Sequence, residues 1–98
     1  MWRHGDVLIE AVREIPCGAR QRPDAVLASG EVTGHCHRVQ DPRSARLFHA
    51  GDADFLEVQT EFAVITHEEH LPITLPRGTY RFWRQREYTP QAIRTVVD

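Results

Sequence analysis

The apolar residues of this chain occur in short runs that proline, glycine and aspartate interrupt. The runs at 6–12, 25–28, 46–49, 54–58, 62–66 and 73–75 are rich in valine, isoleucine, leucine and phenylalanine. Many alternate with polar residues, and this period of two is typical of strands. None is long enough for an amphipathic helix of ordinary length. We therefore predict an all-β fold, either a compact small barrel or a two-sheet sandwich.

Turn signals divide these predicted strands. A glycine and two prolines mark 15–24 as a loop, and Ala50-Gly51-Asp52 is expected to close a hairpin. Pro76-Arg77-Gly78 is expected to turn the chain before 79–88, the longest predicted strand. Thr89 as N-cap and Pro90 at the first helical position then predict a short C-terminal helical turn.

The length limits the architecture to one β-rich domain over residues 1–98. A chain of this size buries about 60–65% of its unfolded surface, so a metal or a subunit interface would add needed stability. We expect a homo-oligomer, because exposed strand edges also need covering. No apolar run approaches a membrane span, and the first residues lack the apolar core of a signal peptide. We expect no membrane partner and a cytoplasmic protein.

Four of the six histidines form two tight pairs, His35 with His37 and His67 with His70. On a strand, residues two apart face the same side with Cα atoms about 6.5–7 Å apart, so both rings can reach one ion. Residues three apart share a face in one helical turn, or can close a turn after a strand. Imidazole is the commonest metal ligand, so the pairs predict a divalent transition metal site, with zinc the first choice. The alternative is that both pairs are exposed or hydrogen-bonded turn residues.

Two carboxylates lie between the histidines of the second pair. The sequence His67-Glu68-Glu69-His70 is one residue shorter than the His-Glu-x-x-His of zinc proteases, so that geometry does not transfer. Glu68 or Glu69 could still be a ligand, a partner that orients a ligand, or a general base. The residues leave open whether such a site is catalytic, which requires an open coordination position. His4 and His49 are isolated, and we expect structural or surface roles for them.

The segment 79–88 suggests a second function, because arginines and aromatic residues alternate along it. Such a strand can stack bases and neutralise phosphates, or form a subunit interface. The alternative is a core strand whose arginines pair with the acidic stretch 52–69. The net charge of −2 does not favour nucleic acid. The candidates for this protein- or nucleic-acid-interaction surface are Arg81, Trp83, Arg84 and Arg86.

Two resemblances accompany these patterns. Gly-Glu-Val-Thr-Gly-His-Cys-His at 30–37 and Pro-Arg-Gly-Thr-Tyr at 76–80 partly resemble the two motifs of the cupin barrel. This likeness implies a reduced, cupin-like barrel, although the spacing from Gly30 to His35 is short and no histidine follows Gly78 at the cupin position. Over nearly its whole length the chain resembles a set of small uncharacterised bacterial proteins, through Gly-Asp-Val-Leu at 5–8, Thr-His-Glu-Glu-His at 66–70 and Arg-Gln-Arg-Glu-Tyr at 84–88. That resemblance implies a free-standing protein and no particular activity or substrate.

Overall fold

The computed structural model describes residues 1–30 and 34–85, and these residues form an all-β structure. The strands are β1 (Trp2–His4), β2 (Val7–Val12), β3 (Arg20–Gln21), β4 (Val26–Ser29), β5 (Cys36–Val39), β6 (Ala45–Ala50), β7 (Ala53–Thr66) and β8 (Ile73–Arg84). Within the described residues no helix has the length and apolar character to cross a membrane. The predicted all-β class is confirmed. The predicted C-terminal helical turn at 89–90 lies outside the described residues.

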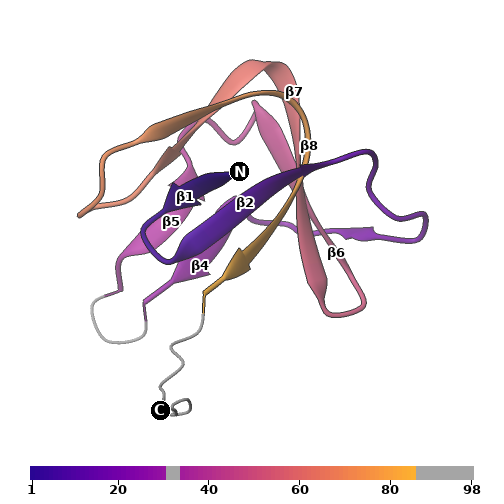
Figure 1. Cartoon of the computed structure of the whole chain (residues 1–98), viewed down its shortest axis with the longest axis horizontal. Helices are drawn as coiled ribbons and strands as arrows, with labels where there is room; N and C mark the ends of the chain where they lie inside the picture. Colours follow the sequence, from indigo (N-terminus) through magenta and orange to yellow (C-terminus); the bar gives the residue numbers. More distant parts are fainter. Residues whose placement is uncertain (31–33, 86–98) are drawn as a thin grey trace.

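All strand pairs are antiparallel, and the main path of the sheet runs β1-β2-β8-β7-β5-β4. Strand β6 pairs with the first half of β7, and β3 pairs with β6 (Figure 1). The sheet curls strongly, so that β1 near one end of the path approaches β5 near the other. The rings of His4 on β1 and His37 on β5 are in direct contact, with their Nδ1 atoms 2.9 Å apart. The curl therefore joins segments that are distant along the sheet.

The long hairpin of β7 and β8 corrects the predicted strand boundaries. The predicted strands 54–58 and 62–66 are one strand, and Pro76-Arg77-Gly78 is part of β8 rather than a turn. Val58 pairs with Gly78 and Phe62 with Pro76, so residues 59–61 face Arg77 alone. A bulge of this kind bends a strand without ending it, and it also accommodates a proline that lacks an N–H. The turn signals in the sequence therefore mark a bulge.

Two short strands escaped the sequence analysis. Strand β1 pairs with β2 across the turn at Gly5 and Asp6, and β3 lies inside the segment predicted to be a loop. Both are only two or three residues long, so their side-chain alternation gives almost no signal. The predicted hairpin between β6 and β7 is confirmed, with Ala50 paired to Ala53.

The core occupies the inner face of the curled sheet. Inward positions of β2 and β8 alternate as the pattern predicts, and the side chains of Val7, Ile9, Tyr80 and Phe82 are all at most 3% exposed. Burying a large aliphatic side chain contributes about 1.5–3 kcal/mol. The same face carries His4 at 1% exposure and His37 at 3%, an unusual burial for polar rings. The other large, fully buried side chains are Leu47, Leu56, Ile65, Leu75, Val39 and Val58.

Candidate metal centre

Three of the four predicted histidine ligands meet in space. His37, His67 and His70 each offer one ring nitrogen, and these atoms lie within 4.8 Å of one another. Ring centroids are 4.3 Å apart for His37 and His67, 4.6 Å for His67 and His70, and 5.6 Å for His37 and His70. Members of both sequence pairs therefore share one candidate site.

Strand pairing explains how the two segments meet. In the antiparallel register of β5 and β7, Arg38 pairs with Thr66 and Val39 with Ile65. Continuing this register by one residue places His67 opposite His37. Because side chains alternate along a strand, His37 points inward with Val39, two residues further on. The site therefore lies where β7 ends and the chain turns toward β8.

His35 lies beside this group and outside it. Its Nδ1 is 3.3 Å from Oε2 of Glu69, and its ring centroid is 5.8 Å from that of His67. His35 precedes the start of β5, so the alternation that would place it on the same side as His37 does not apply. Glu69 is directed to His35 and is therefore a partner of that ring in this arrangement.

Glu68 attaches the segment 67–70, which we call the histidine loop, to β5. Its Oε1 accepts a hydrogen bond from the backbone N–H of Cys36 at 3.0 Å, and its Oε2 accepts one from the Arg38 guanidinium at 2.8 Å. Hydrogen bonds from its own backbone and from Cys36 lower the pKa of the Glu68 carboxyl. Glu68 thus orients the segment that carries His67 and His70. The thiol of Cys36 is directed to the carbonyl of Gly34.

His4 is a buried residue beside the candidate site that the sequence analysis did not assign to it. Its Nδ1 contacts Nδ1 of His37 at 2.9 Å, and its Nε2 lies 3.0 Å from the backbone carbonyl oxygen of Leu71. The ring thus supports His37 from one side and the end of the histidine loop from the other. The available signal was Trp2-Arg3-His4, which alternates just before the Gly5-Asp6 turn and the strand that follows.

Burial keeps these two inner rings neutral. Desolvation, with smaller contributions from the neighbouring His67 and His4 and a partial offset by Asp6, lowers the pKa of His37 to about 4. Desolvation also lowers the pKa of His4, against the opposing effect of its hydrogen bond to Leu71. Neutral imidazole is the form that binds a metal, so His37 needs no deprotonation at neutral pH.

The turn between β1 and β2 closes one side of the centre. Asp6 places Oδ1 3.2 Å from Nε2 of His37, and its Oδ2 lies 3.1 Å from Nε of Arg84. Gly5 packs so closely that a Cβ there would lie 2.7 Å from Nε2 of His70 and 2.9 Å from Cε1 of His37. The backbone of Gly5 therefore forms part of the wall.

Comparison with protein-family models shows that residues 3–85 match a family described as "Domain of unknown function (DUF8820)". The chain belongs to this family. The matched segment includes all the residues of the candidate metal centre. A search of the curated proteins finds no match, and a search of the solved structures finds none.

The predicted interaction surface on β8 is only partly assembled. The guanidinium of Arg81 lies 5.0 Å from the centroid of the Trp83 ring. Arg84 turns instead toward Asp6 and donates a hydrogen bond to the carbonyl of Ser29 at 2.7 Å. These two contacts of Arg84 are with the β1–β2 turn and β4, not with the acidic stretch 52–69. Arg86, the fourth predicted member, lies outside the described residues.

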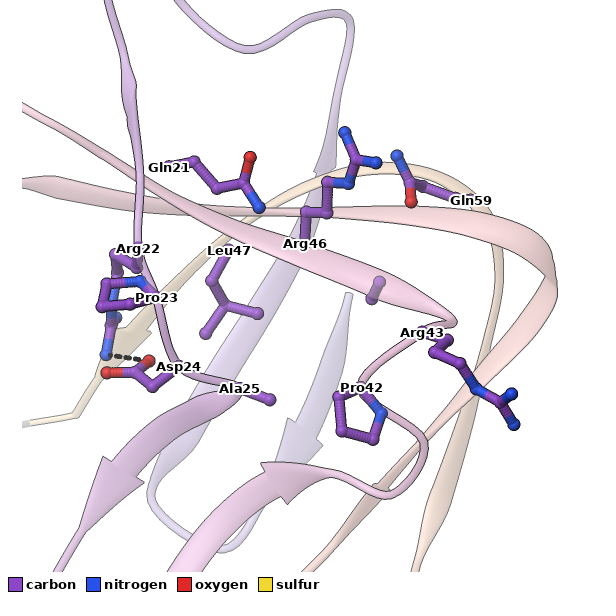
Figure 2. Close-up of a pocket in the computed structure, with 11 residues that line it drawn as sticks. Gln21, Arg22, Pro23, Asp24, Ala25, Pro42, Arg43, Arg46, Leu47 and Gln59 are labelled. Carbon is purple, nitrogen blue, oxygen red and sulfur yellow. Dashed lines mark ion pairs between the residues drawn. The ribbon is translucent and has the colours of Figure 1, made fainter.

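A separate pocket of about 480 Å³ lies beside β3 and β6 (Figure 2), and its lining residues include none of the six histidines. Arg22 is one of its three arginines, and its guanidinium lies 3.1 Å from the Asp24 carboxylate and 3.4 Å from that of Asp54. Arg43 extends into solvent, with its side chain 91% exposed and next to Asp41. Two of the three arginines thus already have carboxylate partners.

Proposed function

We propose that this protein binds a divalent transition metal ion, zinc in the first place, through His37, His67 and His70. The observation that carries the proposal is that three ring nitrogens from two separate segments lie within 4.8 Å of one another. The buried ring of His37 is neutral at pH 7. His67 and His70 belong to the segment that follows β7. Imidazole nitrogens suit zinc, copper, iron and nickel, so the proposal covers each of these metals.

The distances fit a modest closure of the site on the ion. Zinc–nitrogen bonds of 2.0–2.1 Å with tetrahedral angles place ligand atoms about 3.3–3.4 Å apart. The three nitrogens must therefore approach one another by about 1.5 Å at most. His70 is exposed and His67 half-buried, so they can move toward His37, which the strand and the core hold in place.

The test is the metal content of the natively purified protein, with zinc affinity measured by competition against a chromophoric chelator. We expect about one ion per chain and a melting temperature that falls when a chelator removes it. If the ion is present at 100 times its dissociation constant, it adds about 2.7 kcal/mol to the stability. For a domain of this size such a loss lowers the melting temperature by about 10–20 °C.

Single substitutions assign the ligands. His37→Ala, His67→Ala and His70→Ala should each reduce zinc binding strongly, whereas His49→Ala should not. His49 is the matched control because it is an exposed histidine on β6 whose Nδ1 is 2.8 Å from Asp54, outside the centre. Less than about 0.1 ion per chain, with no stabilisation by added zinc, copper, nickel, iron or manganese, contradicts the proposal.

A further inference from the structure

The carboxylate of Asp6 is held in a fixed direction at the edge of the histidine group. The Gly5-Asp6 turn brings it to the site, and Nε of Arg84 lies 3.1 Å from Oδ2. Arg84 is in turn anchored by a 2.7 Å hydrogen bond to the carbonyl of Ser29. These contacts leave the other oxygen, Oδ1, directed at Nε2 of His37 at 3.2 Å.

The hydrogen bonds of His4 and His37 show that the contact between Nε2 of His37 and Oδ1 of Asp6 lacks a hydrogen. The carbonyl of Leu71 can only accept, so Nε2 of His4, 3.0 Å away, carries a hydrogen. In a neutral ring Nδ1 of His4 is then the acceptor, and Nδ1 of His37 must donate to it. The remaining nitrogen of neutral His37, Nε2, is therefore left with a lone pair.

Two acceptors thus face each other across 3.2 Å, the lone pair of His37 and the carboxylate oxygen of Asp6. Such a pair needs a cation in common. A metal ion meets this need, because it binds both lone pairs at once.

We propose that Asp6 is the fourth ligand of the metal centre, so that a zinc-type ion is held by His37, His67, His70 and one carboxylate oxygen. This inference rests on the metal binding proposed above. The 3.2 Å between Oδ1 and Nε2 of His37 is close to the ligand separation of about 3.3–3.4 Å in a tetrahedral zinc site. Asp6 lies outside the group of three nitrogens, so its half-exposed carboxylate turns toward His67 and His70 on binding.

A fourth protein ligand changes the character of the site. Tetrahedral sites with four protein ligands are closed and structural, whereas catalytic zinc sites keep one position for water. Here the ion joins the β1–β2 turn, β5 and the segment after β7. It therefore fastens the curled sheet where segments far apart along the strand order meet.

The test compares wild type with Asp6→Ala and Asp6→Asn in the full chain, and Asp52→Ala is the control. Asp52 is an exposed aspartate in the β6–β7 turn, at least 15 residues along the chain from the three histidines of the proposed site. Asp6→Ala should weaken zinc binding by at least about 100-fold, Asp6→Asn by less, and Asp52→Ala should leave it unchanged. Circular dichroism identifies any variant that fails to fold, in which case the milder Asp6→Asn decides.

Cobalt substitution tests independently whether the metal ion has an open coordination position. The visible spectrum of the cobalt-loaded wild type should not respond to added thiocyanate, because the site is closed, whereas the Asp6→Ala spectrum should respond. A wild-type spectrum that changes with thiocyanate, or an Asp6→Ala variant with wild-type zinc affinity, overturns the assignment of Asp6. A wild type that binds neither cobalt nor any of the five metals named above overturns the proposed function itself.

Discussion

Nδ1 of His37 lies 2.9 Å from Nδ1 of His4, which joins β5 to β1 inside the curled sheet. The two rings are T-shaped, with centroids 4.9 Å apart. Because Nε2 of His4 is bonded to the carbonyl of Leu71, the His4 ring has one acceptor left, and it fixes which nitrogen of His37 carries the hydrogen. In the proposed metal site His4 is therefore a positioning residue, because it keeps Nε2 of His37 available to the ion.

Replacing His4 should weaken metal binding without removing a ligand. We expect His4→Ala to lower zinc affinity by about 10–100-fold, the usual effect of losing a partner that orients a ligand. His4→Asn should recover part of this loss, because an amide oxygen can accept the hydrogen bond from Nδ1 of His37. A purely structural role for His4 would instead lower the melting temperature of both variants and leave their zinc affinity equal to that of wild type.

Gly5 and Gly51 form a matched pair for testing the close approach of the backbone to the site. Their φ angles are 63° and 64°, so alanine at either position costs about 1–2 kcal/mol in backbone strain. Only at Gly5 does the added Cβ meet the histidines, whereas nothing lies within 4 Å of a Cβ at Gly51.

We therefore expect Gly5→Ala and Gly51→Ala to lose similar backbone stability but to differ in metal binding. His70 is exposed and can swing away from the new methyl group, so the clash with its Nε2 should cost zinc affinity, by more than about 10-fold. Chemical denaturation in chelator and zinc competition measure the two effects separately. Equal zinc affinities for the two variants would show that Gly5 does not border the bound ion.

The fold class was predictable from the sequence because alternation is strong in β2, β6, β7 and β8. The strand boundaries were less predictable where two signals conflicted. Pro76 and Gly78 predict a turn, but both remain within β8 because a bulge in β7 lies opposite them. The long-range pairing of β7 with β8 thus overrides the local preference. No local pattern shows how far a sheet will curl.

The histidine pairs were predictable as candidate ligands, but their partners were not. His37 and His67 are joined by the register of β5 with β7, which is a tertiary property. His4 and Asp6 belong to a three-residue strand and its turn, and neither resembles a metal motif. Self-association and a cytoplasmic location stay predictions.

The metal-free protein should lose stability as the pH falls from 7 to 5. In the unfolded chain His37 binds a proton near pH 6.5, but burial lowers its pKa in the folded state to about 4. Between these values the unfolded state binds more protons, so the free energy of unfolding rises with pH and falls on acidification. His37 alone accounts for a loss of about 2 kcal/mol between pH 7 and pH 5.

Urea denaturation in the presence of chelator at pH 7, 6 and 5 measures this dependence. The pKa of His4 is also lowered by burial, and His4 therefore adds to the loss in the same direction. Asp41 and Glu68 have pKa values below their ordinary ones, so they act mainly at lower pH. His37→Gln should flatten the profile, and a wild-type stability that is constant from pH 7 to pH 5 would contradict the buried neutral ring.

Variants of the adjacent Glu68 and Glu69 distinguish the anchoring of the histidine loop from the effect of its negative charge. Glu68 bonds the backbone of Cys36 and the guanidinium of Arg38, whereas Glu69 faces His35, outside the three-histidine group. Glu68→Gln keeps the shape and one acceptor, and Glu68→Ala removes both contacts. The contacts of Glu68 hold His67 and His70 close to His37. We therefore expect Glu68→Ala to lower zinc affinity by about 3–10-fold, an effect of about 1 kcal/mol. Glu68→Gln should lower it less, and Glu69→Ala should leave it unchanged. Chelator competition on the three variants checks the order, and a larger loss in Glu69→Ala than in Glu68→Ala would instead make Glu69 a ligand.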